Sequence, residues 1–300
     1  MSEIVIVPGS SNAPLAFLIA RRLGVKPARA EIRRFPDSEK YVRIDSDVNG
    51  KNVFIVQSMH FKPDEYIIES LLLASAARDA GASSVSLVAP YFAYARQDER
   101  FKPGEAISVA AVAGLLNASG ISSLITVDVH RHRILDFSSV FNGKWIDVSV
   151  MPDLTKYAAS QGLINDKTVI VGPDGEAIQW AKIAAESVGV KEYGALQKKR
   201  YGDEDVKVSG SLDLKGKNVF VVDDIISTGG TIIEASKLIS DGGGKLKGVA
   251  CAHGLFVNEA LYKLYSEGIT EIISSDTVPN QTTRVSSAEA LSKGILSIVK

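Results

Sequence analysis

Residues 219–232 read Val-Phe-Val-Val-Asp-Asp-Ile-Ile-Ser-Thr-Gly-Gly-Thr-Ile. The four apolar residues that open this stretch predict a strand buried on both faces, as in a parallel sheet covered by helices. Asp223 and Asp224 follow them, so we expect both acids at the end of that strand, the edge at which open α/β sheets place ligands. A buried strand with a solvated turn is the plainer alternative, and it leaves the acid pair beside a small-residue loop unexplained.

Ser227 to Thr231 form a loop of small residues that leads into the N-terminus of a predicted helix. Such a loop presents backbone N–H groups and hydroxyls to a phosphate, and the helix dipole adds to the attraction. Two neighbouring carboxylates would repel a bare phosphate. The stretch therefore predicts a site for a sugar phosphate, with its phosphate on the loop and its hydroxyls on the acids.

Short apolar runs alternate with amphipathic stretches along the whole chain, from the run at residues 4–7 to the run at residues 271–273. This alternation is typical of α/β folds, in which crossover helices connect parallel strands. Two β-rich stretches, Ala30–Ile44 and Tyr193–Leu212, interrupt it. The predicted fold class is α/β, with mainly parallel sheets flanked by helices.

An internal sequence repeat indicates a duplication. Residues 50–57, Gly-Lys-Asn-Val-Phe-Ile-Val-Gln, match residues 216–223, Gly-Lys-Asn-Val-Phe-Val-Val-Asp. Gln57 and Ser58 stand where the second copy has Asp223 and Asp224, so we expect two related domains of which only the second kept the acids. The pattern breaks near residues 145–153, which gives an N-terminal domain of residues 1–147 and a C-terminal domain of residues 148–300.

Composition excludes several classes of function. The chain has 300 residues, 45% of them hydrophobic, and 34 basic against 35 acidic residues give a net charge of -1. Without a basic field, nucleic acid is not an expected partner. Cys251 is the single cysteine, which fits a reducing cytoplasm. We expect no signal peptide and no membrane span, because no apolar run reaches about 18 residues.

Two further groups of candidate metal ligands follow apolar runs. Asp128 and His130 come after a run at residues 124–127, and Asp174 follows another at 169–173. Residues two apart at a strand end point the same way, and a carboxylate with an imidazole suits a divalent cation such as Mg²⁺. Alone, each is more simply a capping aspartate or a surface histidine. Beside the 219–232 motif, a metal site is the favoured interpretation.

Three polar clusters offer groups for phosphates or a base. Arg96 and Gln97 follow three aromatics; the arginine suits a base face or a phosphate, and the amide suits an adenine edge. Residues 33–39, Arg-Arg-Phe-Pro-Asp-Ser-Glu, form a turn with an exposed aromatic, and residues 198–200, Lys-Lys-Arg, precede a polar loop. On composition alone, the first could equally be a hydrophobic loop rim followed by a solvated charge run. The second is more simply an edge hairpin, and the third a solvated loop.

Together these stretches resemble the ribose-phosphate diphosphokinases, also called phosphoribosyl-diphosphate synthetases, over almost the full length and in the family's order. Residues 35–39 resemble its nucleotide-contacting hairpin, 90–98 its ATP-binding stretch, 128–130 its metal-binding Asp-x-His, 198–200 its catalytic basic cluster, and 223–232 its ribose-phosphate loop. Departures are Ser38 for a common Gly, Lys199 for an arginine, Ser227 for a common Asp, and the segment after Asp174. The loops look closest to archaeal members.

The resemblance implies two tandem phosphoribosyltransferase-like domains and transfer of the β,γ-diphosphoryl group of MgATP to O1 of ribose 5-phosphate, releasing AMP. It implies Mg²⁺ as cofactor and a homo-oligomer, at least a dimer, because the family's hairpin reaches the ATP of a neighbouring subunit. The implied site residues are Lys198 and Arg200 for catalysis; Phe35, Asp37, Ser38, Glu39, Arg96, Gln97 and Asp98 for ATP; Arg200, Asp223, Asp224, Ser227, Thr228, Gly229, Gly230, Thr231 and Ile232 for ribose 5-phosphate; and Asp128, His130 and Asp174 for the metal.

Two other functions share parts of this pattern. A phosphoribosyltransferase would have the 219–232 motif, but it does not explain the Arg-Gln-Asp stretch, the hairpin or the duplication. A non-catalytic regulator on the same fold does not explain why Lys198, Arg200 and His130 are retained.

Overall fold

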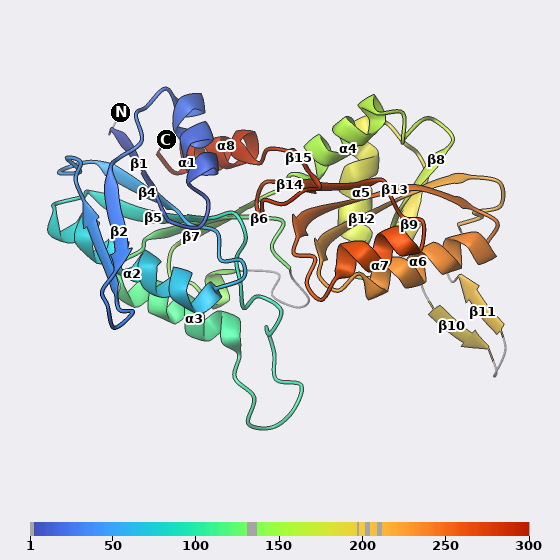
Figure 1. Ribbon diagram of the computed structural model, residues 1–300, viewed down its shortest axis with the longest axis horizontal. Coiled ribbons are helices and arrows are strands. Elements are labelled where there is room, and N and C mark those ends of the chain that lie inside the picture. Colours follow the sequence, from blue (N-terminus) through green and yellow to red (C-terminus); the bar gives the residue numbers. More distant parts are fainter. Residues whose placement is uncertain (1–2, 131–136, 197, 202–204, 209–211, 300) are drawn as a thin grey trace. The chain divides into compact units, whose positions relative to one another are not determined.

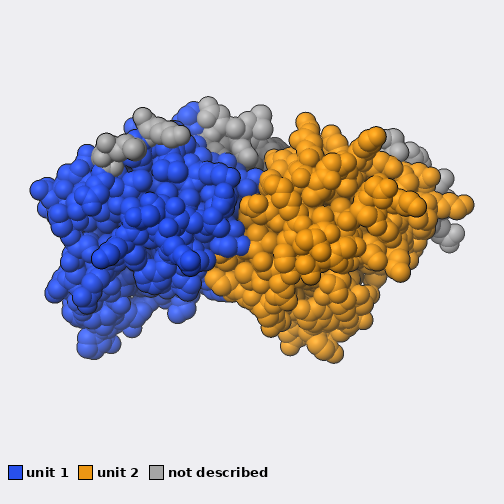
Figure 2. Space-filling model, turned by 90° about the horizontal axis from the view of Figure 1, so that it is seen from above, with its two compact units in different colours: residues 1–149, 286–300 blue, residues 150–285 orange. Residues whose placement is uncertain are grey.

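The computed structural model describes residues 3–130, 137–196, 198–201, 205–208 and 212–299, with the backbone alone at 137, 198–201 and 205–208 (Figure 1). The chain divides into unit 1, residues 1–149 with 286–300, and unit 2, residues 150–285 (Figure 2). The expected boundary at 147/148 lies beside the division at 149/150. Residues 286–300 depart from the expectation, because they belong to the first unit.

Unit 1 is built on a parallel five-stranded sheet in the order β1-β4-β5-β6-β7. The strands are β1 (Ile4–Pro8), β4 (Asn52–Val56), β5 (Ser84–Ala89), β6 (Ser123–Val127) and β7 (Lys144–Val148). Its helices are α1 (Ala13–Leu23), α2 (Pro63–Asp79), α3 (Ser108–Ala118) and α8 (Ala288–Val299), with a 3₁₀ turn at Phe137–Ser139. All five residues of β6 are buried, as expected of a strand covered on both faces.

A hairpin of β2 (Ala30–Arg34) and β3 (Lys40–Ile44) stands apart from this sheet. Its antiparallel register pairs Ala30 with Ile44 and Arg34 with Lys40, which confirms the β-rich stretch predicted at 30–44. Strand β3 packs against α2. The five-residue turn at 35–39 thereby lies at the tip of a supported ribbon.

Unit 2 repeats the same plan. Its sheet has the order β15-β14-β13-β12-β8-β9, and all its neighbouring strands are parallel. The strands are β8 (Thr168–Gly172), β9 (Tyr193–Ala195), β12 (Asn218–Ile226), β13 (Lys245–Gly254), β14 (Ile272–Ser275) and β15 (Thr283–Val285). The helices are α4 (Met151–Ser160), α5 (Ile178–Val188), α6 (Gly230–Asp241) and α7 (Ala260–Ser266), and β10 (Lys198–Tyr201) pairs with β11 (Asp205–Val208) in a separate ribbon.

The two segments that repeat each other in sequence, residues 50–57 and 216–223, also repeat each other in structure. Gly50 and Gly216 both adopt left-handed conformations, with φ of 69° and 71°. Each donates its N–H at 2.8 Å to the carbonyl of a glycine that follows the next helix, Gly81 in unit 1 and Gly243 in unit 2. Strands β4 and β12 then take equivalent places. Each is hydrogen-bonded to the strand of its sheet that comes first in the chain, β1 in unit 1 and β8 in unit 2.

The last helix explains why the C-terminal residues join unit 1. Helix α4 follows β7 in the chain yet packs on α5 and β13 of unit 2, whereas α8 follows β15 and packs on α1, β6 and β7 of unit 1. Gly294 permits this approach, since a Cβ there would lie 3.0 Å from Ile125 Cγ2 and 3.3 Å from Val148 Cγ1. Each unit is therefore completed by a helix that follows the other unit's last strand.

Candidate active site

The two acids of the 219–232 stretch lie within β12 rather than after it. Pairing with β8 ends at Val221, but pairing with β13 continues from Asp223 opposite Cys251 to Ile226 opposite Gly254. The expectation that the strand ends at the acids was therefore wrong, because the long neighbour β13 extends it on one side. Asp223 and Asp224 still lie past the last β8 pair, at the carboxyl edge of the sheet.

Local hydrogen bonds fix both carboxylates. Asp223 Oδ1 accepts from the Asp224 N–H at 3.0 Å, and Asp224 Oδ1 accepts from the Ile225 N–H at 2.8 Å. Burial and the neighbouring carboxylate of Asp224 raise the pKa of Asp223 well above its ordinary value, and the charge of Asp174 acts in the same direction. Three carboxylates thus share one region of unit 2. A cation or sugar hydroxyls there would relieve their repulsion.

The loop after β12 opens the N-terminus of α6. Gly229 is the N-cap in a left-handed conformation with φ of 81°, and no side chain caps the helix. Ser227 is half-buried, whereas Thr228, Gly230 and Thr231 are exposed. The N–H groups of the first turn lack the usual side-chain acceptor and are suited to an anion.

Ile232 is different from the rest of this loop. Its side chain is 1% exposed and belongs to the core of unit 2. Any contact of Ile232 with a phosphate would therefore come from its backbone N–H, while the side chain anchors the first turn of α6.

The predicted metal ligands are divided between the units. Asp174 follows β8 in unit 2, and its Oδ1 accepts from the N–H groups of Glu176 at 3.0 Å and Ala177 at 3.2 Å. Asp128 and His130 follow β6 in unit 1. Within the described ranges, no three His, Cys, Asp or Glu side chains gather closely enough to hold a metal ion. Carboxylate oxygens are nevertheless the donors that Mg²⁺ takes, and it needs only one or two of them.

Asp128 sits in a strained turn. It is buried, and its φ of 39° is left-handed for a residue other than glycine. Its N–H donates to the Val148 carbonyl at 2.9 Å. The Asp147 carboxylate accepts from the Val129 N–H at 3.2 and 3.3 Å and from Thr126 Oγ1 at 2.7 Å. Strand β7 therefore fixes the turn that carries Asp128, and residues held in such conformations cluster at functional sites.

The hairpin tip at 35–39 is built as an exposed turn. Phe35 is 41% exposed and meets Tyr41 edge-on at 5.7 Å, with the Arg33 guanidinium 4.8 Å from the Phe35 ring centre. Ser38, with φ of 77°, donates its N–H to the Phe35 carbonyl at 2.9 Å. The positive φ explains why a glycine would suit this position. Asp37 and Glu39 are exposed.

The segment after β5 places Arg96 at the surface and buries Asp98. Gln97 is half-buried, and its amide nitrogen donates to the Glu99 carbonyl at 3.1 Å and to Glu105 Oε2 at 3.2 Å. Glu105 was not singled out from the sequence. Its position just before a predicted helix was the available signal.

Lys198 and Arg200 lie on β10, opposite Val208 and Val206 of β11. Their side chains lie outside the part of the chain that the structure describes. The polar loop predicted after Arg200 includes residues 202–204, which lie outside the described residues.

A buried ion pair was also missed by sequence reasoning. Glu69 is fully buried and pairs with Lys40. It also accepts from Ser10 Oγ at 2.7 Å and from Gln57 Nε2 at 2.6 Å. In unit 1, Gln57 therefore supports the loop after β1, whereas its counterpart Asp223 lies past the last β8 pair at the carboxyl edge of the sheet. No sequence pattern distinguishes such a buried glutamate from the exposed acids of a helix.

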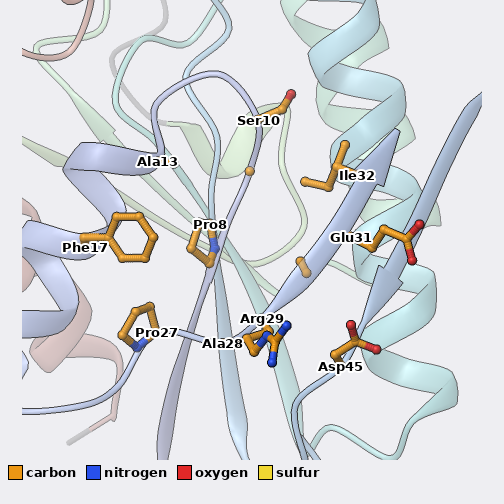
Figure 3. Close-up of a pocket in the computed structure, with 12 residues that line it drawn as sticks. Pro8, Ser10, Ala13, Phe17, Pro27, Ala28, Arg29, Glu31, Ile32 and Asp45 are labelled. Atoms are coloured by element: carbon orange, nitrogen blue, oxygen red, sulfur yellow. The ribbon is translucent and has the colours of Figure 1, made fainter. Parts of the chain in front are cut away.

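A cavity of about 770 Å³ lies in unit 1 among β1, α1 and the β2–β3 hairpin. Figure 3 shows Phe17 and Pro27 on one side of it and Glu31 and Asp45 on the other. It contains none of the residues predicted to bind ATP, ribose 5-phosphate or metal. No helix in the described ranges is long and apolar enough to cross a membrane.

Known proteins match this chain over most of its length. Residues 4–120 match the family model of the N-terminal domain of ribose phosphate pyrophosphokinase, and residues 156–287 match that of the phosphoribosyl transferase domain. The chain is 36% identical over 299 residues to the ribose-phosphate pyrophosphokinase of Methanobrevibacter smithii, covering 96% of this chain and 98% of that one. It is 39% identical over 276 residues to that of Thermococcus kodakarensis, covering 91% and 94%.

A solved structure agrees over the same extent. The crystal structure of phosphoribosylpyrophosphate synthetase from Mycobacterium smegmatis matches with a TM-score of 0.87 at 28% identity, covering 99% of each chain.

Proposed function

The chain belongs to the ribose-phosphate pyrophosphokinase family, and we propose that it transfers the β,γ-diphosphoryl group of MgATP to O1 of ribose 5-phosphate through the residues set out below. It is an enzyme of the transferase class that serves nucleotide biosynthesis. The observation that carries the assignment of its site is the β12–α6 segment, in which two fixed carboxylates precede an uncapped helix N-terminus.

Ribose 5-phosphate binds to unit 2. Its phosphate lies on the loop from Ser227 to Ile232 and accepts from backbone N–H groups, with the hydroxyls of Thr228 and Thr231 beside it. Asp223 and Asp224 accept hydrogen bonds from the ribose hydroxyls, which fixes the sugar and directs O1.

MgATP is held by elements of unit 1. Arg96, Gln97 and Asp98 come from the segment after β5, and Phe35, Asp37, Ser38 and Glu39 come from the hairpin tip. The exposure of Phe35 supports contact with the adenine of ATP bound to a neighbouring subunit, so we propose a homo-oligomer, at least a dimer. Asp128, His130 and Asp174 supply oxygen and nitrogen donors for Mg²⁺, which would neutralise charge on the phosphates.

The reaction forms a bond from O1 to phosphorus, breaks one phosphorus–oxygen bond, and releases the proton of the O1 hydroxyl to solvent. O1 of ribose 5-phosphate attacks the β-phosphorus, the bond from that phosphorus to the α,β-bridging oxygen breaks, and AMP leaves. Lys198 and Arg200 stabilise the charge on the transferring group, and Arg200 also contacts ribose 5-phosphate. Alignment and charge neutralisation are what phosphoryl transfer requires of a protein. We place the enzyme in the cytoplasm, where its ATP is supplied, with neither nucleic acid nor membrane as a partner.

The test is incubation with ribose 5-phosphate and MgATP, followed by detection of AMP and 5-phosphoribosyl 1-diphosphate in equal amounts. A phosphoribosyltransferase would instead consume phosphoribosyl diphosphate with a base and release diphosphate. A regulator would give no turnover with either mixture. Either result would contradict the proposal.

A further inference from the structure

Glu105 organises the loop that carries Arg96 and Gln97. Its Oε2 accepts three hydrogen bonds, from the N–H of Phe101 at 2.9 Å, the N–H of Lys102 at 3.0 Å and the amide nitrogen of Gln97 at 3.2 Å. Its backbone carbonyl accepts from Arg100 Nε at 3.0 Å. One half-buried carboxylate thereby closes residues 97–105 into a compact loop.

This arrangement determines which way the Gln97 amide faces. Its nitrogen has two hydrogens, and the two acceptors on the inner side are the Glu99 carbonyl and Glu105 Oε2. If the amide turned over, its oxygen would face a carbonyl and a carboxylate, which repel it, and both donors would lose their acceptors. The nitrogen is therefore directed into the loop and the oxygen away from it.

We propose that Glu105 is a positioning residue that sets base selectivity by holding the Gln97 amide with its oxygen toward the nucleotide. This inference rests on the proposed function and on the place given there to Gln97. An outward oxygen accepts from the exocyclic amino group of adenine. Guanine has a carbonyl oxygen at that position, so the same amide would meet it with repulsion.

The role requires an acceptor at residue 105 rather than a negative charge. In Glu105→Gln, the side-chain oxygen can take the place of Oε2 and keep all three hydrogen bonds. In Glu105→Ala, one of the two acceptors of the Gln97 nitrogen is lost and only the Glu99 carbonyl remains. The amide then turns over more readily, and its nitrogen can donate to guanine. The two variants therefore separate hydrogen-bond orientation from electrostatics.

The experiment measures kcat/KM for ATP and for GTP at saturating ribose 5-phosphate. We expect wild type to prefer ATP, and Glu105→Ala to lower the ATP-to-GTP ratio about tenfold, the effect of one hydrogen bond. Glu105→Gln should stay near the wild-type ratio. Glu267→Ala, an exposed glutamate of unit 2, is the matched control and should leave the ratio unchanged.

A double mutant shows whether Glu105 acts through Gln97. Gln97→Leu should lower the ratio by itself, and Glu105→Ala added to it should change the ratio no further. Amide exchange at Phe101 and Lys102 should accelerate in Glu105→Ala and stay slow in Glu105→Gln. If Glu105→Ala does not fold, Gln97→Leu and Glu105→Gln still decide the matter.

Several results would overturn the inference: equal use of ATP and GTP by wild type, an equal loss of both nucleotides in Glu105→Ala, an unchanged ratio in Gln97→Leu, or a Glu105→Gln variant that behaves like Glu105→Ala. Absence of AMP formation by wild type would instead refute the proposed function itself. The two failures are thus distinguishable.

Discussion

Two adjacent glycines in the loop proposed to bind ribose 5-phosphate are expected to respond in opposite ways to the same substitution. Gly229 has φ of 81°, and a Cβ there would lie 3.2 Å from Leu264 Cγ and 3.4 Å from both Leu264 Cδ atoms. Leu264 is fully buried. The left-handed conformation costs an alanine roughly 1 kcal/mol or more, and crowding a buried leucine adds to that. We expect Gly229→Ala to lower the free energy of unfolding by about 1–2 kcal/mol.

Gly230 is the first residue of α6, and the nearest atom to a Cβ there is Thr228 Oγ1 at 3.9 Å. Alanine costs nothing in such space, and helix propensity favours it by up to about 1 kcal/mol. Its methyl group would nevertheless lie in the loop where we propose that the phosphate binds. We expect Gly230→Ala to raise the KM for ribose 5-phosphate about tenfold, equivalent to the loss of one good hydrogen bond, without loss of stability.

Thermal unfolding and steady-state kinetics on the two variants test this reasoning. For a domain of this size, Gly229→Ala should lower Tm by roughly 3–8 °C, and Gly230→Ala should leave Tm unchanged or slightly raised. If Gly230→Ala destabilises as much as Gly229→Ala, the packing argument is wrong. If Gly230→Ala keeps the wild-type KM, the loop does not receive the phosphate in the way proposed.

Three further predictions concern other residues that have a role in the proposed function. Lys198→Ala should lower kcat by a factor on the order of 10²–10³ while substrate affinity changes little. Steady-state kinetics measure this, and a normal far-UV circular dichroism spectrum shows that the variant is folded. A near-normal kcat in the folded variant would contradict the role of Lys198. Burial and Asp224 raise the pKa of Asp223, so this carboxyl stabilises the fold below its ordinary pKa, and that stability is lost as pH rises through the raised value. In urea unfolding without metal or substrate, Asp223→Asn should therefore be more stable than wild type at neutral pH, and it should be less active. Equal or lower stability of Asp223→Asn would contradict the raised pKa. Phe35→Ala should raise the KM for ATP without unfolding the protein, and mixed oligomers with Lys198→Ala, after confirmed subunit exchange, should exceed the summed activity of the two parents; activity that never exceeds that sum would assign the hairpin to its own chain.

Much of the fold could be predicted because the relevant signals are local. The apolar run before Asp223, the repeated segment at 50–57 and the β-rich stretch at 30–44 each depend on neighbouring residues, and the structure has strands at all three. The place of α8 depends instead on packing between segments far apart in the sequence. A helix at the end of the chain carries no mark of the unit that it completes.

The candidate site likewise combines features that depend on neighbouring residues in the sequence with features that depend on packing between distant segments. The small-residue loop and the acids could be recognised from their spacing, but the extension of β12 to Ile226 depends on the length of its neighbour β13. Glu105 and Glu69 could not be recognised, because a glutamate that accepts buried hydrogen bonds has the same sequence signature as one facing solvent. Such residues are identified only once their partners are placed.

In the proposed reaction, the β- and γ-phosphoryl groups of ATP move together as one diphosphoryl group. The most direct measurement uses ATP labelled at its β-phosphorus, with ribose 5-phosphate and Mg²⁺, and follows the label by separation of the products. We expect the label in the diphosphate of 5-phosphoribosyl 1-diphosphate, with one unlabelled AMP formed for each product molecule. Label retained in ADP, or released as inorganic phosphate, would contradict it.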